Sequence, residues 1–261
     1  MIKIITGYSG PGGSTVALKN LCLEFNKRGI ECEMYGHNNW FLQFGNSCKP
    51  MSQLSIKQDD KLISHFIGLK NCKKENVIFS CHEMWWFNFS SVTNYFNKVQ
   101  FLTQKQADYH KSIKDYVLIP NVKEEITISR TEEAENVAGI IGNIDERKDL
   151  VSSIERALAD GCRKVLIYGQ IFNMQYFTNQ ITPFFGKGVV YMGYEKSKEK
   201  IYSSIDRVYH MSKGEVASLV KDECYTTNTL FFGNESTDNV VSTMSNDEVI
   251  AKWLKEFNYE N

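Results

Sequence analysis

Short apolar runs alternate with segments of helical period along the whole chain, and this alternation is the strongest constraint on its fold. The first series predicts a helix at 14–28 and strands at 2–6, 31–35, 77–81, 99–102 and 116–119. The second series predicts helices at 150–159 and 247–257 and strands at 137–141, 164–168, 189–192, 207–211 and 229–232. Such alternation is typical of the α/β class, so we predict two Rossmann-like, doubly wound parallel sheets that face a ligand-binding cleft.

The stretch 123–136 is polar, acid-rich and without a strong period, which is typical of a linker. It predicts an N-terminal domain at 1–124 and a C-terminal domain at 125–261. The first holds 15 Lys and Arg residues against 10 Asp and Glu, and the second holds 15 against 21. This asymmetry suggests that the N-terminal domain meets an anionic partner, and chance variation of solvated surfaces is the alternative.

Composition excludes several other classes of protein. Hydrophobic residues make up 42% of the chain and aromatic residues 13%, which indicates a globular core and not a disordered chain. Seven scattered cysteines without a C-x-x-C pair favour reduced thiols and a cytoplasmic location. The first residues predict a strand and not a signal peptide, and no apolar run reaches the ~18 residues of a membrane span. The five histidines lack metal-ligand spacing, so we expect no metal site.

A glycine-rich segment, Gly7 to Ser14, follows the first predicted strand and opens the first predicted helix. Bare backbone N–H groups at a helix N-terminus bind phosphate well. The segment departs from the phosphate loop of NTPases because Gly13 stands where that loop has its lysine, so an NTPase is the weaker interpretation. A tight turn of purely structural importance is the other alternative.

Two acidic residues, Glu215 and Glu223, stand eight positions apart in a segment that we predict to be helical from Glu215 onward. At ~100° per residue both carboxylates would lie on nearly the same face of that helix. An ordinary amphipathic helix with two exposed glutamates is the alternative.

Earlier in the C-terminal half, Arg147 and Lys148 precede a helix and are suited to hold a diphosphate, or else form a solvated basic pair.

Several motifs occur in one order along the chain: the glycine loop, His82 at a strand end, Pro120-Asn121, Gly142-x-Ile144-x-x-Arg147-Lys148, Tyr168-Gly169, Tyr191–Tyr194, and Ser212-x-x-Glu215 with seven residues to Glu223. This order resembles the retaining GT-B glycosyltransferases, the family that includes glycogen synthases and bacterial mannosyl- and glucosyltransferases. The likeness runs from Gly7 to about Leu230. It implies a GT-B fold and transfer of a hexose from a nucleotide-sugar, with a UDP-sugar as the co-substrate and no other cofactor.

The resemblance also implies roles for individual residues. Glu215 would lie against the transferred sugar, Glu223 would bind the ribose hydroxyls, and the loop at Gly193 and Tyr194 would lie near the base. The groups implied to face the donor phosphates or sugar are Gly12, Gly13, Arg147, Lys148 and the backbone N–H groups near Ser218 and Leu219.

On the acceptor side, the resemblance implies that His82 faces the sugar and the acceptor; a capped or core histidine is the alternative. Trp85 and Trp86 are suited to stack on sugars or nucleobases, or else belong to the core. The basic N-terminal half favours an anionic acceptor, either a glycan or a hydroxymethylated or glucosylated DNA base. Val216-Ala217 and 227–229 depart from the family pattern, so a catalytically inactive binding subunit stays an alternative.

Overall fold

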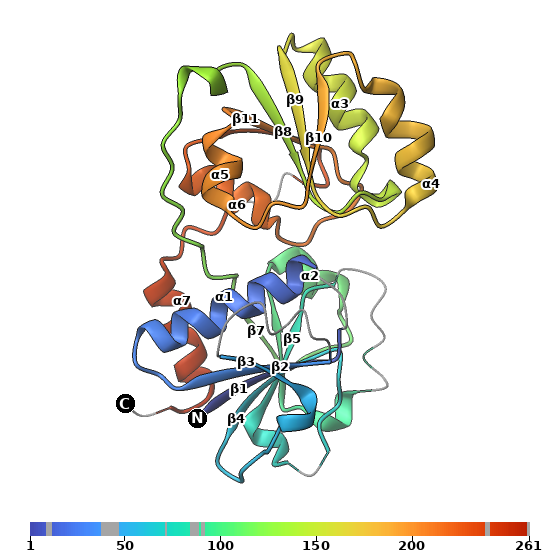
Figure 1. The fold of residues 1–261 in the computed structure, drawn as a ribbon. Coiled ribbons are helices and arrows are strands. Elements are labelled where there is room, and N and C mark those ends of the chain that lie inside the picture. The colour runs from blue at the N-terminus through green and yellow to red at the C-terminus, as the bar shows by residue number, and fades with distance from the viewer. Residues whose placement is uncertain are drawn as a thin grey trace. The chain divides into compact units, whose positions relative to one another are not determined.

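The structure is a computed structural model that describes residues 1–8, 12–37, 47–70, 72–83, 89, 92–237 and 241–259. The chain forms two compact units. The first contains Met1–Lys123 and Ser242–Asn261, and the second contains Glu124–Val241 (Figure 1). No helix of the described residues is both long enough and apolar enough to cross a membrane.

The first unit is built on a seven-stranded, all-parallel sheet in the order β3-β2-β1-β4-β5-β6-β7. Its strands are β1 Ile2–Thr6, β2 Cys32–Gly36, β3 Cys48–Pro50, β4 Lys61–His65, β5 Val77–Cys81, β6 Lys98–Phe101 and β7 Tyr116–Leu118. Its α-helices are α1 Gly13–Lys27, α2 Gln104–Tyr109 and α7 Asn246–Glu256. The strand order reverses between β1 and β4. In doubly wound sheets, ligands bind at the carboxyl ends of the strands at such a reversal.

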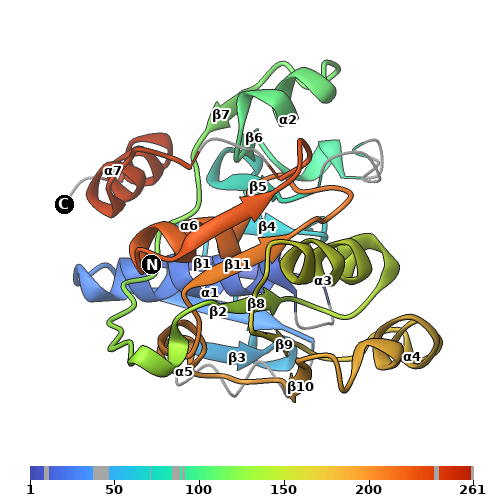
Figure 2. The same cartoon turned by 90° about the horizontal axis from the view of Figure 1, so that it is seen from above.

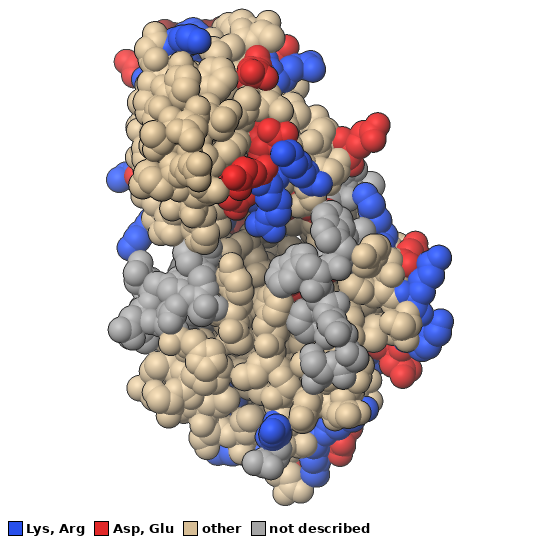
Figure 3. Space-filling view, turned by 90° about the vertical axis from the view of Figure 1, so that its right-hand side faces the viewer, with Lys and Arg blue, Asp and Glu red and all other residues tan. Residues whose placement is uncertain are grey.

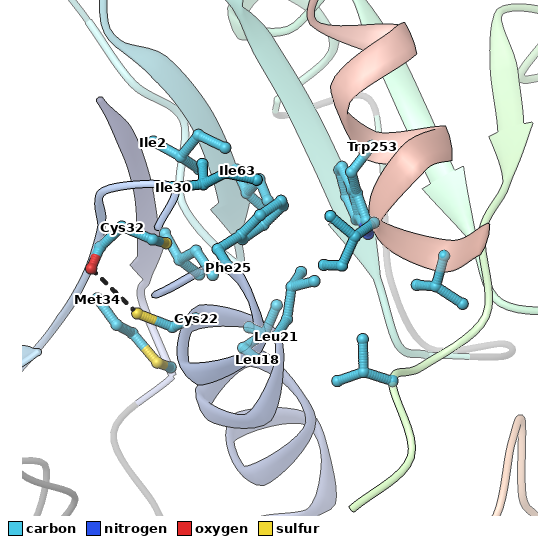
Figure 4. Close-up of a cluster of buried hydrophobic side chains, with 14 of the residues drawn as sticks. Ile2, Leu18, Leu21, Cys22, Phe25, Ile30, Cys32, Met34, Ile63 and Trp253 are labelled. Carbon is cyan, nitrogen blue, oxygen red and sulfur yellow. Dashed lines mark hydrogen bonds between the residues drawn. The ribbon is translucent and has the colours of Figure 1, made fainter. Parts of the chain in front are cut away.

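Helices α1 and α7 cover one face of this sheet. Leu18, Leu21, Cys22 and Phe25 recur at helical spacing along α1 and meet Trp253 of α7 in a single buried cluster (Figure 4). Figure 4 also shows the hydrogen bond that the Cys22 thiol donates to the Cys32 carbonyl, at 3.5 Å. A second cluster, which includes Phe79, Phe89, Phe96 and Phe101, fills the opposite face.

The position of α7 differs from the sequence-based division, which assigned 125–261 to one domain. The helix belongs to the first unit. Its apolar stripe of Val249, Ile250 and Trp253 is buried in the same cluster as α1. Two hydrogen bonds hold its start beside the end of the first segment: Lys123 N donates to Asn246 Oδ1 at 2.8 Å, and Asn246 Nδ2 donates to the Lys123 carbonyl at 2.9 Å.

The second unit is a five-stranded parallel sheet in the order β10-β9-β8-β11-β12. Its strands are β8 Val137–Ile141, β9 Lys164–Tyr168, β10 Val189–Gly193, β11 Arg207–His210 and β12 Leu230–Gly233. Its α-helices are α3 Leu150–Ala159, α4 Met174–Tyr176, α5 Lys198–Ser203 and α6 Leu219–Thr226, and a π-helical turn at Phe177–Ile181 follows α4.

Alternating side chains of β9 show that this sheet is covered on both faces. Val165 and Ile167 are buried with α3, whereas Leu166 and Tyr168 are buried with α5 and α6. Figure 2 shows α3 on the side of the sheet opposite α5 and α6. The doubly wound α/β architecture predicted from the sequence is therefore confirmed.

Two strands of the first unit were missed by the sequence analysis, which predicts no strand between 31–35 and 77–81. These are β3 and β4, and β4 pairs with β1 at the centre of the sheet. In β4 only Leu62 and Ile63 are apolar, yet Ser64 and His65 are also buried. A run of two apolar residues between polar ones carries too little period to be recognised.

Candidate functional site

The strand order of the second sheet reverses between β8 and β11, and the loops that follow these two strands converge there. Lys213 N donates to the Arg147 carbonyl at 2.9 Å, and Ser212 Oγ lies 3.4 Å from the same oxygen. The loop after β8 also crowds the loop after β9. A Cβ added at Gly169 would lie 1.8 Å from the Gly142 carbonyl, so only glycine fits at this close approach.

Glu215 is the centre of the polar groups at this edge. His210 Nε2, at the end of β11, lies 3.0 Å from Glu215 Oε1, and the Lys148 ammonium is ion-paired with the same oxygen. The Glu215 side chain is 14% exposed. Burial raises the pKa of its carboxyl, but the hydrogen bond from His210 and the charge of Lys148 outweigh burial and lower the pKa to about 2. Glu215 is therefore a carboxylate that two donors hold in place.

The prediction that a helix starts at Glu215 is wrong. Helix α6 begins at Leu219, and Ser218 caps it by accepting a hydrogen bond from Lys221 N at 3.3 Å. Glu215 lies in the preceding loop, so it shares no helix face with Glu223. The physical reason is competition: the serine supplies a good N-cap at 218, while Lys148 and His210 hold the Glu215 carboxylate outside the helix.

Glu223 is buried within α6 and is 7% exposed. Tyr202 donates its hydroxyl to Glu223 Oε2 at 2.7 Å, and Lys198 Nζ lies 2.6 Å from Oε1. Lys198 also pairs with Glu124 at 2.5 Å. Burial lowers the pKa of the Lys198 ammonium, but Glu223 and Glu124 outweigh burial and raise the pKa above its ordinary value. A ribose hydroxyl at Glu223 would therefore share the carboxylate with a lysine and a tyrosine.

The other predicted groups of the second unit lie at the same carboxyl edge of the sheet. Arg147 is exposed in the short turn after β8. Gly193 ends β10 with φ of 79°, which suits glycine, and Tyr194 follows it with 53% of its surface exposed. Ser218 and Leu219 form the N-terminus of α6. The fold thus gathers Arg147, Lys148 and Glu215 in two touching loops, while Glu223 binds a different lysine.

The first unit has its own polar cluster at the ends of β1, β4 and β5. Thr6 Oγ1 lies 2.8 Å from His65 Nδ1, and His65 Nε2 lies 3.5 Å from Glu83 Oε1. Tyr8 N donates to Thr6 Oγ1 at 3.1 Å. His65 is fully buried, so this chain of polar contacts links the start of the glycine loop to the end of β5.

His82 follows β5, as the sequence predicts. Its Nε2 lies 3.1 Å from Ser80 Oγ, and its backbone N donates to Glu83 Oε2 at 3.1 Å. Burial of the ring lowers its pKa well below the ordinary value, and the nearby His65 adds to this effect. The imidazole is therefore neutral at pH 7.

Gly12 and Gly13 lie at the start of α1, where Gly12 is the N-cap and no side chain caps the helix. Residues 9–11 of the glycine loop are outside the described residues, and so are Trp85 and Trp86.

The polar residues of these clusters that were not singled out from the sequence include His65, Lys198 and His210. His65 ends a strand that the sequence analysis missed. His210 lies at the end of a predicted strand, so its position carried a usable signal. Within the described ranges, no group of three or more His, Cys, Asp and Glu side chains is placed to hold a metal ion.

Comparison with solved structures identifies the fold. The chain is similar to WaaG, a glycosyltransferase involved in lipopolysaccharide biosynthesis, with TM-score 0.64 and 12% identity over 99% of this chain and 90% of WaaG. It is similar to Anabaena HepE in complex with UDP-glucose, with TM-score 0.60 and 12% identity over 98% of this chain and 90% of HepE.

A third similar structure is TarM, with TM-score 0.59 and 16% identity over 77% of this chain, which spans only 55% of TarM. These likenesses show that the chain has the GT-B fold. No protein-family profile matches the sequence, and no curated protein matches it either.

Proposed function

We propose that the chain is a retaining glycosyltransferase that moves a hexose from a UDP-sugar, such as UDP-glucose, to a hydroxyl group. One observation carries this proposal: Arg147, Lys148 and Glu215 meet in two touching loops at the reversal point of the second sheet. Ligands of doubly wound sheets bind at such points. HepE, a structural neighbour, was solved with UDP-glucose, and this supports the choice of donor.

The charges of the site suit a diphosphate leaving group. As the bond between the anomeric carbon and the phosphate oxygen breaks, the guanidinium of Arg147 and the ammonium of Lys148 stabilise the developing negative charge. Glu215 accepts hydrogen bonds from sugar hydroxyls. The acceptor hydroxyl bonds to the anomeric carbon on the face that the phosphate leaves, and its proton passes to the leaving phosphate. Configuration is thereby retained without a separate general base.

The acceptor in this proposal is anionic, either a glycan or a hydroxymethylated or glucosylated DNA base. The first unit supports it with 17 Lys and Arg residues against 13 Asp and Glu. On the face drawn in Figure 3 both signs lie side by side, so the basic excess forms no single patch there. Transfer to such an acceptor should weaken steeply with salt, and a flat response would exclude nucleic acid.

A binding subunit without catalysis is the second candidate. The observation that favours it is the occupied Glu223 carboxylate, whose two oxygens already accept from Tyr202 and Lys198. Slow release of UDP from a UDP-sugar by the purified chain would exclude this candidate.

The decisive experiment is a thermal-shift panel of UDP-, GDP-, ADP- and TDP-sugars, with ATP as the control for an NTPase. We expect UDP-glucose or another UDP-sugar to raise the melting temperature, and ATP to leave it unchanged. Transfer from labelled UDP-sugar and the anomeric coupling constant of the product then test the reaction and its stereochemistry. A shift with ATP alone would overturn the proposal.

A further inference from the structure

A polar pocket of about 460 Å³ lies in the second unit beside the candidate site. Glu146 and Lys213 contribute to its wall. Glu146 is the neighbour of Arg147 in sequence, and the backbone of Lys213 is hydrogen-bonded to that of Arg147. The pocket therefore takes part of its wall from the same two loops that carry the residues proposed to bind the donor. Its volume is that of small-molecule sites.

The side chains of the pocket are those that bind hydroxyl groups. Gln175, Asn179 and Gln180 present amides, which both donate and accept hydrogen bonds. Glu146 and Asp149 present carboxylates, which only accept. Val151 and the ring of Tyr176 add limited apolar surface. A polyol matches this mixture of donors and acceptors.

The charge of the pocket selects against anions. Two carboxylates, Glu146 and Asp149, face one ammonium, Lys213, so the wall carries a net negative charge. A phosphate, sulfate or carboxylate group would be repelled at this short range. The net charge of the pocket is thus opposite to that of the neighbouring pair, Arg147 and Lys148.

Hydrogen bonds connect the walls of the pocket to one another. Asn173 Nδ2 donates to Glu146 Oε1 at 2.9 Å, and Asn173 Oδ1 accepts from Tyr176 N at 3.0 Å. The backbone N of Asn173 also donates to the Ile144 carbonyl at 3.1 Å. The start of α4 is therefore fixed to the loop after β8. Because this part of the wall is already ordered, less conformational entropy is lost when a ligand binds.

Two unusual backbone features lie in the same wall. Asn179 and Gln180 belong to the π-helical turn Phe177–Ile181, a conformation that is frequent at functional sites. Asp149 has φ of 46° between the turn after β8 and helix α3. Left-handed residues other than glycine cost free energy and cluster at ligand sites. Both features point to the same pocket.

We propose that this pocket binds a neutral, hydroxyl-rich group, namely a sugar ring of the acceptor. The inference rests on the proposed function, since it takes the ligand next to the donor site to be the acceptor. In that case the acceptor's neutral sugar lies in the second unit, while any anionic part lies elsewhere.

Saturation-transfer NMR of the full chain with methyl α-glucoside, methyl α-galactoside and N-acetylglucosamine tests the proposal. We expect at least one neutral sugar to bind. The double variant Asn179→Ala/Gln180→Ala should weaken the binding of that sugar about 3- to 10-fold, because it loses hydrogen bonds between neutral partners. Asp149→Asn should weaken it too, because asparagine tolerates the left-handed conformation and only the charge is lost. Gln53→Ala, an exposed amide of the first unit, is the matched control and should change nothing.

Absence of binding by all three sugars, or binding that these pocket substitutions leave unchanged, would overturn the proposal. Stronger binding of glucuronic acid that weakens with the pocket substitutions would overturn it as well. The UDP-sugar thermal shift separates this failure from failure of the proposed function. Pocket substitutions should leave that shift intact, whereas a wild-type chain without the shift would refute the donor assignment alone.

Discussion

The ammonium of Lys148 and the carboxylate of Glu215 form an ion pair between the loop after β8 and the loop after β11. Both side chains are largely buried, with 19% and 14% of their surfaces exposed. A phosphate that binds Lys148 must compete with Glu215, whose Oε1 would keep its contact with His210 Nε2 at 3.0 Å. The pair thus links the anion-binding group of the proposed site to its sugar-facing acid.

Removing a cation from the donor site should slow transfer strongly. We expect Arg147→Ala or Lys148→Ala to lower kcat by about 10²–10³-fold, because each removes a cation proposed to stabilise the leaving diphosphate. Steady-state UDP release measures the effect. Lys164→Ala, at an exposed lysine of the same unit, should keep wild-type activity. Equal rates in all three variants would contradict the assignment of Arg147 and Lys148 to the leaving diphosphate.

Replacing Glu223 should weaken donor binding. We expect Glu223→Gln to raise the Kd for UDP-glucose roughly tenfold or more, because a charged hydrogen-bond acceptor for the ribose hydroxyls is lost. Titration calorimetry gives the Kd. The exposed Glu155→Gln on α3 is the control. An unchanged Kd would mean that Lys198 and Tyr202 hold Glu223 for a structural purpose only.

The pH dependence of stability should report Glu215. Its pKa falls from 4.5 to about 2 on folding, so its carboxylate stabilises the native state above pH 4.5. That stabilisation, on the order of 3 kcal/mol, is lost as pH falls from 4.5 toward 2. Glu215→Gln should therefore show a shallower loss of urea stability across this window than the wild type. Parallel pH curves for the two proteins would contradict the lowered pKa.

Helix α7 should stabilise the first unit and not the second. We expect Trp253→Ala to destabilise the first unit by about 3–5 kcal/mol, because the indole is buried against α1. Hydrogen exchange read by mass spectrometry should show lost protection in β1 and α1, with β8 and β9 unchanged. Trp253→Phe should destabilise the first unit less than Trp253→Ala does. Lost protection in β8 would place the helix with the other unit.

The strands and helices of the second unit were predictable because they carry strong local signals. β8, β9 and α3 begin and end where the sequence analysis places them. Each strand is a run of apolar residues with buried side chains on both faces, and α3 keeps a regular apolar stripe. The start of α6 was not predictable in the same way, because a serine cap and an ion pair decided between two starts.

The α/β class, the repeated strand–helix series and the motifs at the strand ends follow from the amino-acid sequence alone, since they depend on periodicity and residue type. The partners of the polar groups are known only from the folded chain. The burial of β4, the docking of α7 on α1, and the separation of Glu215 from Glu223 all depend on residues distant in sequence. Such contacts form only when the sheets assemble, because the free energy gained by pairing and burial then exceeds local preference.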